Sequence, residues 1–203
     1  MNIHPIDYKE YILKMDYKDV SLIDPPWNYN DKIPKTKKQL NYNLWNDNDK
    51  ELDFCFENIK ASYLFMWTTN SFIENCMKAN HHKFVYKTMA TWVKKTSNGK
   101  TFWGLGSNFR NCTEQLLLFT RKKEKPVHLS MRNLIEEKAG KRTQKPKLFE
   151  VELLTKLQEK NLNMFSYIFS GLETACFNKF DIDLVDISLT EKVTNEASTY
   201  FSN

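Results

Sequence analysis

The chain has 203 residues, of which 41% are hydrophobic and 14% aromatic, and this apolar content excludes a chain that is disordered throughout. The length suits one α/β domain with a substantial core. A total of 30 Lys and Arg residues against 25 Asp and Glu gives a net charge of +5, which permits a nucleic-acid partner without requiring one.

No apolar run approaches the roughly 20 residues that a membrane span needs, and the N-terminus has no apolar signal segment. We therefore expect a soluble, intracellular protein without a membrane partner. The cysteines are widely spaced and form no CxxC pair, so we predict reduced thiols and no metal site; they are Cys55, Cys76, Cys112 and Cys176.

Hydrophobic patterning predicts strands and helices that alternate along the chain. An amphipathic stretch at 8–15 is followed by strands at 19–23, 62–70, 83–95, 114–122, 163–171 and 180–188. Helices are predicted at 50–59, after residue 70 with Ser71 helping to cap it, and at 145–160 with Pro146 in the first turn. The connections include a long polar segment at 28–50, a glycine-punctuated loop at 95–109 and an exposed loop at 123–144.

This alternation predicts an α/β fold with a mostly parallel sheet and helices on both faces. We expect a single domain over residues 1–188 and a polar C-terminal tail over 189–203. Ligands of such sheets bind beyond the carboxyl ends of the strands. Three polar strand ends, at 24–27, 68–70 and 170–171, are therefore expected to meet in one crevice.

The stretch DPPW (24–27) directly follows the first buried strand. Each proline fixes its own φ and restricts the residue before it, so the segment is stiff. Because neither proline has an N–H, the segment offers the Asp24 carboxylate and carbonyl oxygens as acceptors, which suits the two donors of an exocyclic amine. Trp27 adds a face on which a planar base can stack. The alternative is a rigid turn with a core Trp, and the four residues alone do not decide between the two.

Further motifs occur in a fixed order after DPPW. Residues 63–121 contain a strand ending in W-x-T-N, a helix, W-V-K, then G-x-G-x-x-F-R-N-x-x-E and a strand. The segment RTQKPKLFEVE (142–152) follows. Over roughly residues 19–172 this order resembles the MT-A70 family of S-adenosylmethionine-dependent adenine-N6 methyltransferases, and 142–152 is similar to the family's HS-x-KP segment.

The resemblance implies a Rossmann-like methyltransferase fold in which the catalytic motif precedes the cofactor motif. It also implies methyl transfer from S-adenosylmethionine to N6 of adenine. The implied catalytic residues are Asp24, Pro25, Pro26 and Trp27. In this reading the Asp24 carboxylate and the Pro25 carbonyl accept the amine hydrogens, and Trp27 stacks on the base. The implied substrate-binding residues are Tyr42, Asn70, Arg110, Asn111 and Glu114.

The cofactor half of the chain resembles the family less closely than the catalytic half. The residues implied to bind S-adenosylmethionine are Asp24, Lys145, Ser170 and Gly171. Lys145 matches the lysine of the family's KP pair, and the alternative is a solvated lysine at a helix start. Arg142-Thr143 stand where the family usually has His-Ser, and residues 171–173 replace an Arg followed by polar residues.

The expected partner is nucleic acid, with DNA favoured over RNA because the chain resembles the compact prokaryotic and phage members of the family. Lysines in the polar loop and the basic segment 121–147 supply charge that can follow a phosphate backbone. Two alternatives stay open: the same chemistry on RNA, and a non-catalytic member that binds nucleic acid or scaffolds a partner. The sequence also leaves open a monomer, a homodimer or a pairing with a paralogue.

Overall fold

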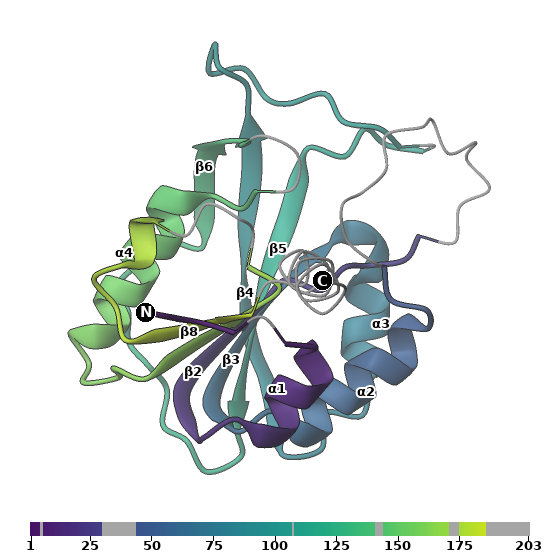
Figure 1. Cartoon of the computed structure of the whole chain (residues 1–203). Coiled ribbons are helices and arrows are strands. Elements are labelled where there is room, and N and C mark those ends of the chain that lie inside the picture. The colour runs from purple at the N-terminus through teal and green to yellow at the C-terminus, as the bar shows by residue number, and fades with distance from the viewer. Residues whose placement is uncertain (5, 30–43, 107, 141–143, 171–174, 186–203) are drawn as a thin grey trace, which may run out of the picture.

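A computed structural model describes residues 1–4, 6–29, 44–106, 108–140, 144–170 and 175–185. The described residues build one eight-stranded sheet with the order β1-β8-β7-β2-β3-β5-β4-β6 (Figure 1). The strands are β1 (Asn2–Ile3), β2 (Lys18–Ile23), β3 (Ala61–Thr69), β4 (Phe84–Lys95), β5 (Thr113–Arg121), β6 (Leu134–Lys138), β7 (Phe165–Ile168) and β8 (Ile182–Val185).

The sheet is mostly parallel, as the sequence predicts. Strand β2 lies at its centre and pairs in parallel with β3 and with β7. Only β5 runs against its two neighbours, β3 and β4, among the pairings of the described strands. The carboxyl ends of β2, β3, β4 and β7 therefore meet the beginning of β5 at one edge of the sheet.

Helices cover both faces of the sheet, which confirms the predicted layers (Figure 1). The helices are α1 (Tyr8–Lys14), α2 (Asn48–Asn58), α3 (Ile73–Lys78) and α4 (Lys147–Gln158), with short 3₁₀ turns at Asn70–Phe72 and Ala175–Phe177. Helices α1, α2 and α3 pack on one face, and α4 packs on the other. None of the described helices is long and apolar enough to cross a membrane.

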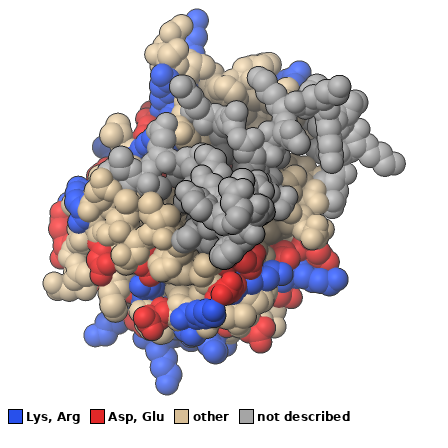
Figure 2. Space-filling model, viewed as in Figure 1, with Lys and Arg blue, Asp and Glu red and all other residues tan. Residues whose placement is uncertain are grey.

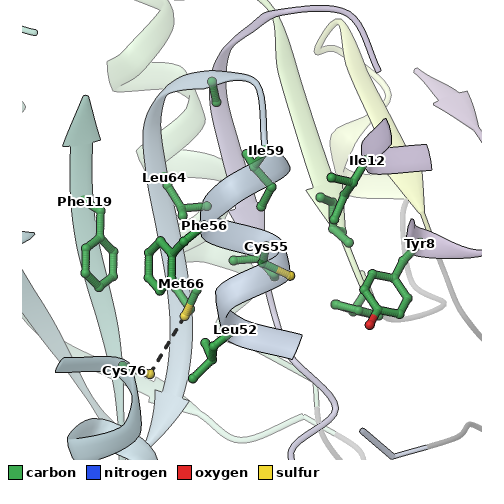
Figure 3. Packing of buried hydrophobic residues seen from close by; sticks show 14 of the residues in the cluster. Tyr8, Ile12, Leu52, Cys55, Phe56, Ile59, Leu64, Met66, Cys76 and Phe119 are labelled. Carbon is green, nitrogen blue, oxygen red and sulfur yellow. Dashed lines mark hydrogen bonds between the residues drawn. The ribbon is translucent and has the colours of Figure 1, made fainter. Parts of the chain in front are cut away.

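Apolar side chains fill the space between the sheet and helices α1–α3. The first two of these helices begin at a capping aspartate. Asp7 caps α1 by accepting from the Lys9 N–H at 2.9 Å, and Asp47 caps α2 by accepting from the Lys50 N–H at 3.2 Å. The core of this face includes Ile12, Leu52, Cys55, Phe56, Leu64, Met66 and Phe119 (Figure 3). The thiols of Cys55 and Cys76 lie in this core, and all four cysteines are free, as predicted.

The face covered by α4 follows the two-residue period of the strands. Val20 and Leu22 of β2 point to this face and pack with Leu153, Leu154 and Leu157 of α4. The next residue of that period after Leu22 is Asp24, just beyond the end of β2. The two-residue period thus places the carboxylate of the DPPW stretch directly after the apolar core residues of β2.

Three details differ from the prediction. The exposed loop expected at 123–144 contains β6, an edge strand parallel to β4 in which only Ile135 is buried, so its apolar pattern is too short to detect. Ser71 caps no helix, because the chain first forms a 3₁₀ turn, and α3 has no side-chain cap. Pro146 is the N-cap of α4 rather than a residue of its first turn.

The domain boundaries remain a prediction, since the tail at 189–203 lies outside the described residues. Tyr42 and Gly171 also lie outside them. The two cores share a single sheet, which is consistent with one folding unit over the described part of the chain.

Candidate active site

Asp24 lies at the carboxyl end of the central strand. Its N–H donates to the Ile168 carbonyl of β7 at 3.1 Å, which holds the chain against the neighbouring strand after β2 has ended. The Asp24 side chain is 17% exposed and faces the same side of the sheet as α4. This is the place where ligands bind in open α/β sheets.

Lys145 joins two carboxylates at this edge. Its Nζ lies 2.8 Å from Asp24 Oδ1 and 3.0 Å from Glu114 Oε2, and its side chain is only 10% exposed. Lys145 is therefore a buried, paired lysine and not a solvated residue at a helix start. The residues come from β2, β5 and the segment before α4, so the fold assembles what the sequence separates.

Lys94 extends the cluster on the other side of Glu114. Its ammonium forms an ion pair with Glu114 Oε1 and lies over the Trp92 ring, 5.1 Å from the centroid. The result is a row of alternating charges, Lys94–Glu114–Lys145–Asp24, which we call the charge row. Because the row has two cations and two carboxylates, its formal charge is balanced at neutral pH.

Burial and neighbouring charge set the ionisation of the row. Burial, helped by the Glu114 carboxylate, raises the pKa of Asp24 to about 6 against the opposing effect of Lys145. Burial also acts to raise the pKa of Glu114, but the ammonium groups of Lys145 and Lys94 hold it below its usual range. For Lys145, burial lowers the pKa but both carboxylates outweigh it, so the pKa lies above its usual value. Asp24 and Glu114 are thus both ionised at neutral pH.

A third buried carboxylate, Glu150 of α4, lies behind the charge row. Its Oε1 accepts from Trp67 Nε1 at 2.9 Å and from the Tyr167 hydroxyl at 2.7 Å. The Trp67 ring in turn lies 5.9 Å from Lys145 Nζ. Glu150 therefore fixes the ring against which the central lysine of the row packs.

Glu150 makes the stability of the protein depend on pH. Burial raises its pKa from 4.5 to about 7, and the hydrogen bonds from Tyr167 and Trp67 offset only part of this. A carboxyl with a raised pKa contributes stability that is present below the unfolded pKa and is lost as the pH rises through about 7. We expect Glu150→Gln, which keeps the acceptor oxygen and removes the charge, to have little effect near pH 4.5. At pH 8 it should stabilise the fold by up to about 3 kcal/mol.

Denaturant unfolding at the two pH values measures this difference. The matched control is Glu152→Gln, at an exposed glutamate on the same helix, which should change the stability by less than about 0.5 kcal/mol. Equal effects of Glu150→Gln at both pH values would contradict the assignment of Glu150 as a group that titrates near neutrality.

The two prolines after Asp24 present carbonyl oxygens that are already partly used. The Pro25 carbonyl accepts from the Trp27 N–H at 2.9 Å, and the Pro26 carbonyl accepts from the Trp45 N–H at 2.9 Å. A carbonyl oxygen has two lone pairs, so each keeps one acceptor position. These bonds also fix the direction of both carbonyls.

Trp27 belongs to the core on the opposite face from the charge row. It is 6% exposed, stacks on Phe72 with ring centroids 4.8 Å apart, and meets Trp45 edge-on at 5.2 Å. A base that stacks on Trp27 has to displace one of these neighbours. Tyr29, which is 47% exposed and packs edge-on against Phe72, is the more accessible aromatic residue of this segment.

The end of β7 carries the predicted Ser170. Ser170 is 2% exposed, and its hydroxyl has no partner among the described residues. The residue before it, Phe169, has the left-handed φ of +65°, which is unusual outside glycine and is stabilised here by packing on Tyr8 and Trp45. A buried hydroxyl without a partner among the described residues needs one, and a bound ligand can supply it.

The other predicted substrate residues lie at two places. Asn70 joins β3 to β5: its Nδ2 donates to Thr113 Oγ1 at 3.0 Å, and its Oδ1 accepts from Gln115 Nε2 at 3.2 Å. Arg110 and Asn111 are exposed on the connection between β4 and β5. Of the residues F-R-N-x-x-E, the structure brings only Glu114 to Asp24 and Lys145.

Sequence reasoning missed Lys94 and Glu150, although each has a signal. Lys94 stands two residues after the buried Trp92, so the strand period places it on the same buried face. Glu150 stands three, four and seven residues before Leu153, Leu154 and Leu157, so it lies on the apolar stripe of α4. In each case a charged residue on a buried face is the signal of a paired site.

Comparison with known proteins gives one family. The MT-A70 family model matches residues 18–170, which contain β2 through β7 and every residue of the charge row. No curated protein matches the chain significantly. Because the matched segment spans most of the chain, the protein belongs to the MT-A70 family of adenine-N6 methyltransferases.

Proposed function

We propose that the protein transfers a methyl group from S-adenosylmethionine to N6 of adenine in DNA. The observation that carries the proposal is Asp24, an ionised carboxylate fixed at the carboxyl end of β2 by Lys145. Lys145 Nζ contacts this carboxylate at Oδ1, at 2.8 Å. A fixed carboxylate beside rigid carbonyls is a set of acceptors for an amino group.

The residues of the site fit the cofactor that the family uses. The buried Ser170 hydroxyl has no partner among the described residues, and the Asp24 carboxylate suits an ammonium group. We therefore assign Ser170, Asp24 and Lys145 to cofactor binding, together with Gly171, which lies outside the described residues. When bound, S-adenosylmethionine supplies an electrophilic methyl group.

Asp24 and Pro25 act on the amine of the substrate. The N6 lone pair of adenine is delocalised into the ring, which makes the amine a poor nucleophile. Acceptors on its hydrogens favour the localised form, and acceptors that are fixed beforehand need no reorganisation during the reaction. The ion pair with Lys145 and the bond from Trp27 N–H to Pro25 hold both groups in place. A strong general base is not required, since the methylated ammonium is acidic.

Trp27 and Pro26 shape the pocket in this proposal, and Tyr42 covers the base. Because Trp27 packs on Phe72, its ring forms a wall of the pocket. It contacts the base through the small part of the ring that stays exposed. Asn70, through its bonds to Thr113 and Gln115, holds the neighbouring strand ends. Arg110 and Asn111 contact the nucleic acid outside the pocket.

DNA is the proposed substrate, and the adenine is flipped out or unpaired when it reacts. The test is a methyl-transfer assay with labelled cofactor on duplex DNA, single-stranded DNA and RNA of one sequence, followed by nucleoside analysis. We expect N6-methyladenine in DNA. Label in RNA alone would show that the protein carries out the same chemistry on RNA. If no nucleic acid is labelled and no cofactor binding is detected, the result favours a non-catalytic scaffold.

A further inference from the structure

The connection between β4 and β5 exposes large apolar side chains. We call the described residues of this connection, 96–106 and 108–112, the β4–β5 loop. Trp103 is 78% exposed, Leu105 84% and Phe109 86%, which are among the highest values of any large hydrophobic residue in the described chain. The connection between these strands projects above the sheet in Figure 1. Several exposed apolar side chains on one loop mark an interaction site.

The described part of the loop has a close-packed backbone. A Cβ atom at Gly104 would lie 1.9 Å from the Asn111 carbonyl oxygen, and one at Gly106 would lie 2.0 Å from that of Phe109. Side chains at these two positions are therefore excluded by backbone atoms. The two arms approach closely while Trp103, Leu105 and Phe109 stay in solvent, so the loop presents these side chains rather than burying them.

The base of the loop is attached to the charge row through one residue. The Lys94 N–H donates to the Cys112 carbonyl at 2.8 Å, and the Phe102 N–H donates to the Lys94 carbonyl at 2.8 Å. The side chain of the same Lys94 pairs with Glu114. The two arms of the loop thus leave the sheet directly beside the candidate active site.

The charge of this part of the chain fits a polyanion. From residue 75 to residue 113 the sequence has seven Lys and Arg residues and no Asp or Glu. Figure 2 shows basic side chains at the tip of the projection. Aromatic rings combined with cations and without acids are the features of surfaces that bind single-stranded nucleic acid. A surface that binds another protein has no such need to exclude carboxylates.

We propose that the β4–β5 loop is a stacking platform for unpaired bases of the nucleic-acid strand that enters the active site. Trp103 and Phe109 stack on bases, and Lys100 and Arg110 meet phosphates. The inference rests on the proposed function, because it names how the substrate of that same site is held. It also requires an unpaired segment, since a base inside an intact duplex exposes no face to a ring.

The fluorescence of Trp103 itself reports on oligonucleotide binding. The chain has five tryptophans, and the other four are at most 6% exposed. Fluorescence that is accessible to a soluble quencher therefore comes from Trp103. Titration with a 20-nucleotide single-stranded DNA should quench this emission and protect it from acrylamide, while a duplex of the same sequence should do so more weakly. Trp103→Phe should remove the signal and keep the affinity measured by anisotropy of a labelled oligonucleotide.

Variants separate stacking from other roles. Trp103→Ala and Phe109→Ala should each weaken binding of the single strand about 10-fold. Leu105→Ala should change it less than twofold, because leucine has no ring face. Leu148→Ala is the matched control: it is also 78% exposed but lies on α4. All four side chains are in solvent, so melting temperatures should stay unchanged.

Two results would overturn the proposal. One is unchanged single-strand affinity in the Trp103→Ala and Phe109→Ala double variant. The other is that the loop variants, Leu105→Ala included, abolish self-association in sedimentation but keep the affinity for the oligonucleotide. That result would make the loop a protein interface. Failure of the proposed function is seen separately: a wild-type protein that binds the oligonucleotide through Trp103 but methylates nothing would overturn only the methyl transfer.

Discussion

Replacing Asp24 by Asn should lower methyl transfer by about 10³-fold or more while the fold stays intact. The substitution keeps the shape of the side chain but removes the charge that faces Lys145 and makes one of the two acceptors a donor. Loss of one fixed group that stabilises a transition state costs about 10²–10³-fold, and here the ion pair that orients the group is lost too. Rates with labelled cofactor under saturating conditions measure the effect.

The pH dependence of the wild-type rate provides an independent check on Asp24. Burial raises the pKa of Asp24 to about 6, so the rate should fall about tenfold for each pH unit below that value. The control variant Glu152→Gln, which changes an exposed carboxylate on α4, should keep both the rate and this profile. Near-normal methyl transfer by Asp24→Asn would show that the Asp24 carboxylate has no role in the mechanism.

Replacing Lys145 by Met should destabilise the protein by about 3–5 kcal/mol, the usual cost of removing one partner of a buried ion pair. The change leaves Asp24 and Glu114 without the ammonium that lies 2.8 and 3.0 Å from them. The pKa of Asp24 should then rise further, and the acidic limb of the pH–rate profile should move to higher pH. Denaturant unfolding and the profile give the two effects separately.

A second variant and a control make the Lys145 experiment specific. Adding Glu114→Gln to Lys145→Met removes one of the two uncompensated charges and should recover part of the lost stability. Lys78→Met breaks an exposed i,i+4 pair with Glu74 and should leave the midpoint unchanged. A loss of stability from Lys145→Met no larger than that control would mean that solvent screens the charge row.

The layers of the fold are predictable from sequence because the strands of this sheet are buried on both faces. β2, β3 and β5 each appear as continuous apolar runs, and the helical spacing of α2 and α4 is clear. Strand β6 was not predicted, since at the edge of the sheet it buries only Ile135 and its other residues match a polar loop. The reversed direction of β5 is also invisible in its own residues, because pattern does not encode strand direction.

The candidate site was predictable only as a set of separate motifs. The order of the motifs in the sequence assigned Asp24, Glu114 and Lys145 to the site, and the fold brings these three together. Their pairing was not predictable, since a lysine beside a helix and a glutamate at the start of a strand are most often solvated. Lys94 and Glu150 lie on buried faces, which marks each as a paired residue, but the sequence does not identify their partners.

The position of β2 has a consequence for how the protein is made. One neighbour of β2 is β7, and the contact between Ser21 and Ser166 spans 145 residues of sequence. A chain emerging from the ribosome therefore exposes one edge of its central apolar strand until nearly all of the described sequence has been synthesised. Such non-local pairing slows folding and leaves an unpaired edge open to aggregation. We expect nascent chains truncated before β7 to require chaperones, and the DPPW segment to reach its final position only in the last stage of folding.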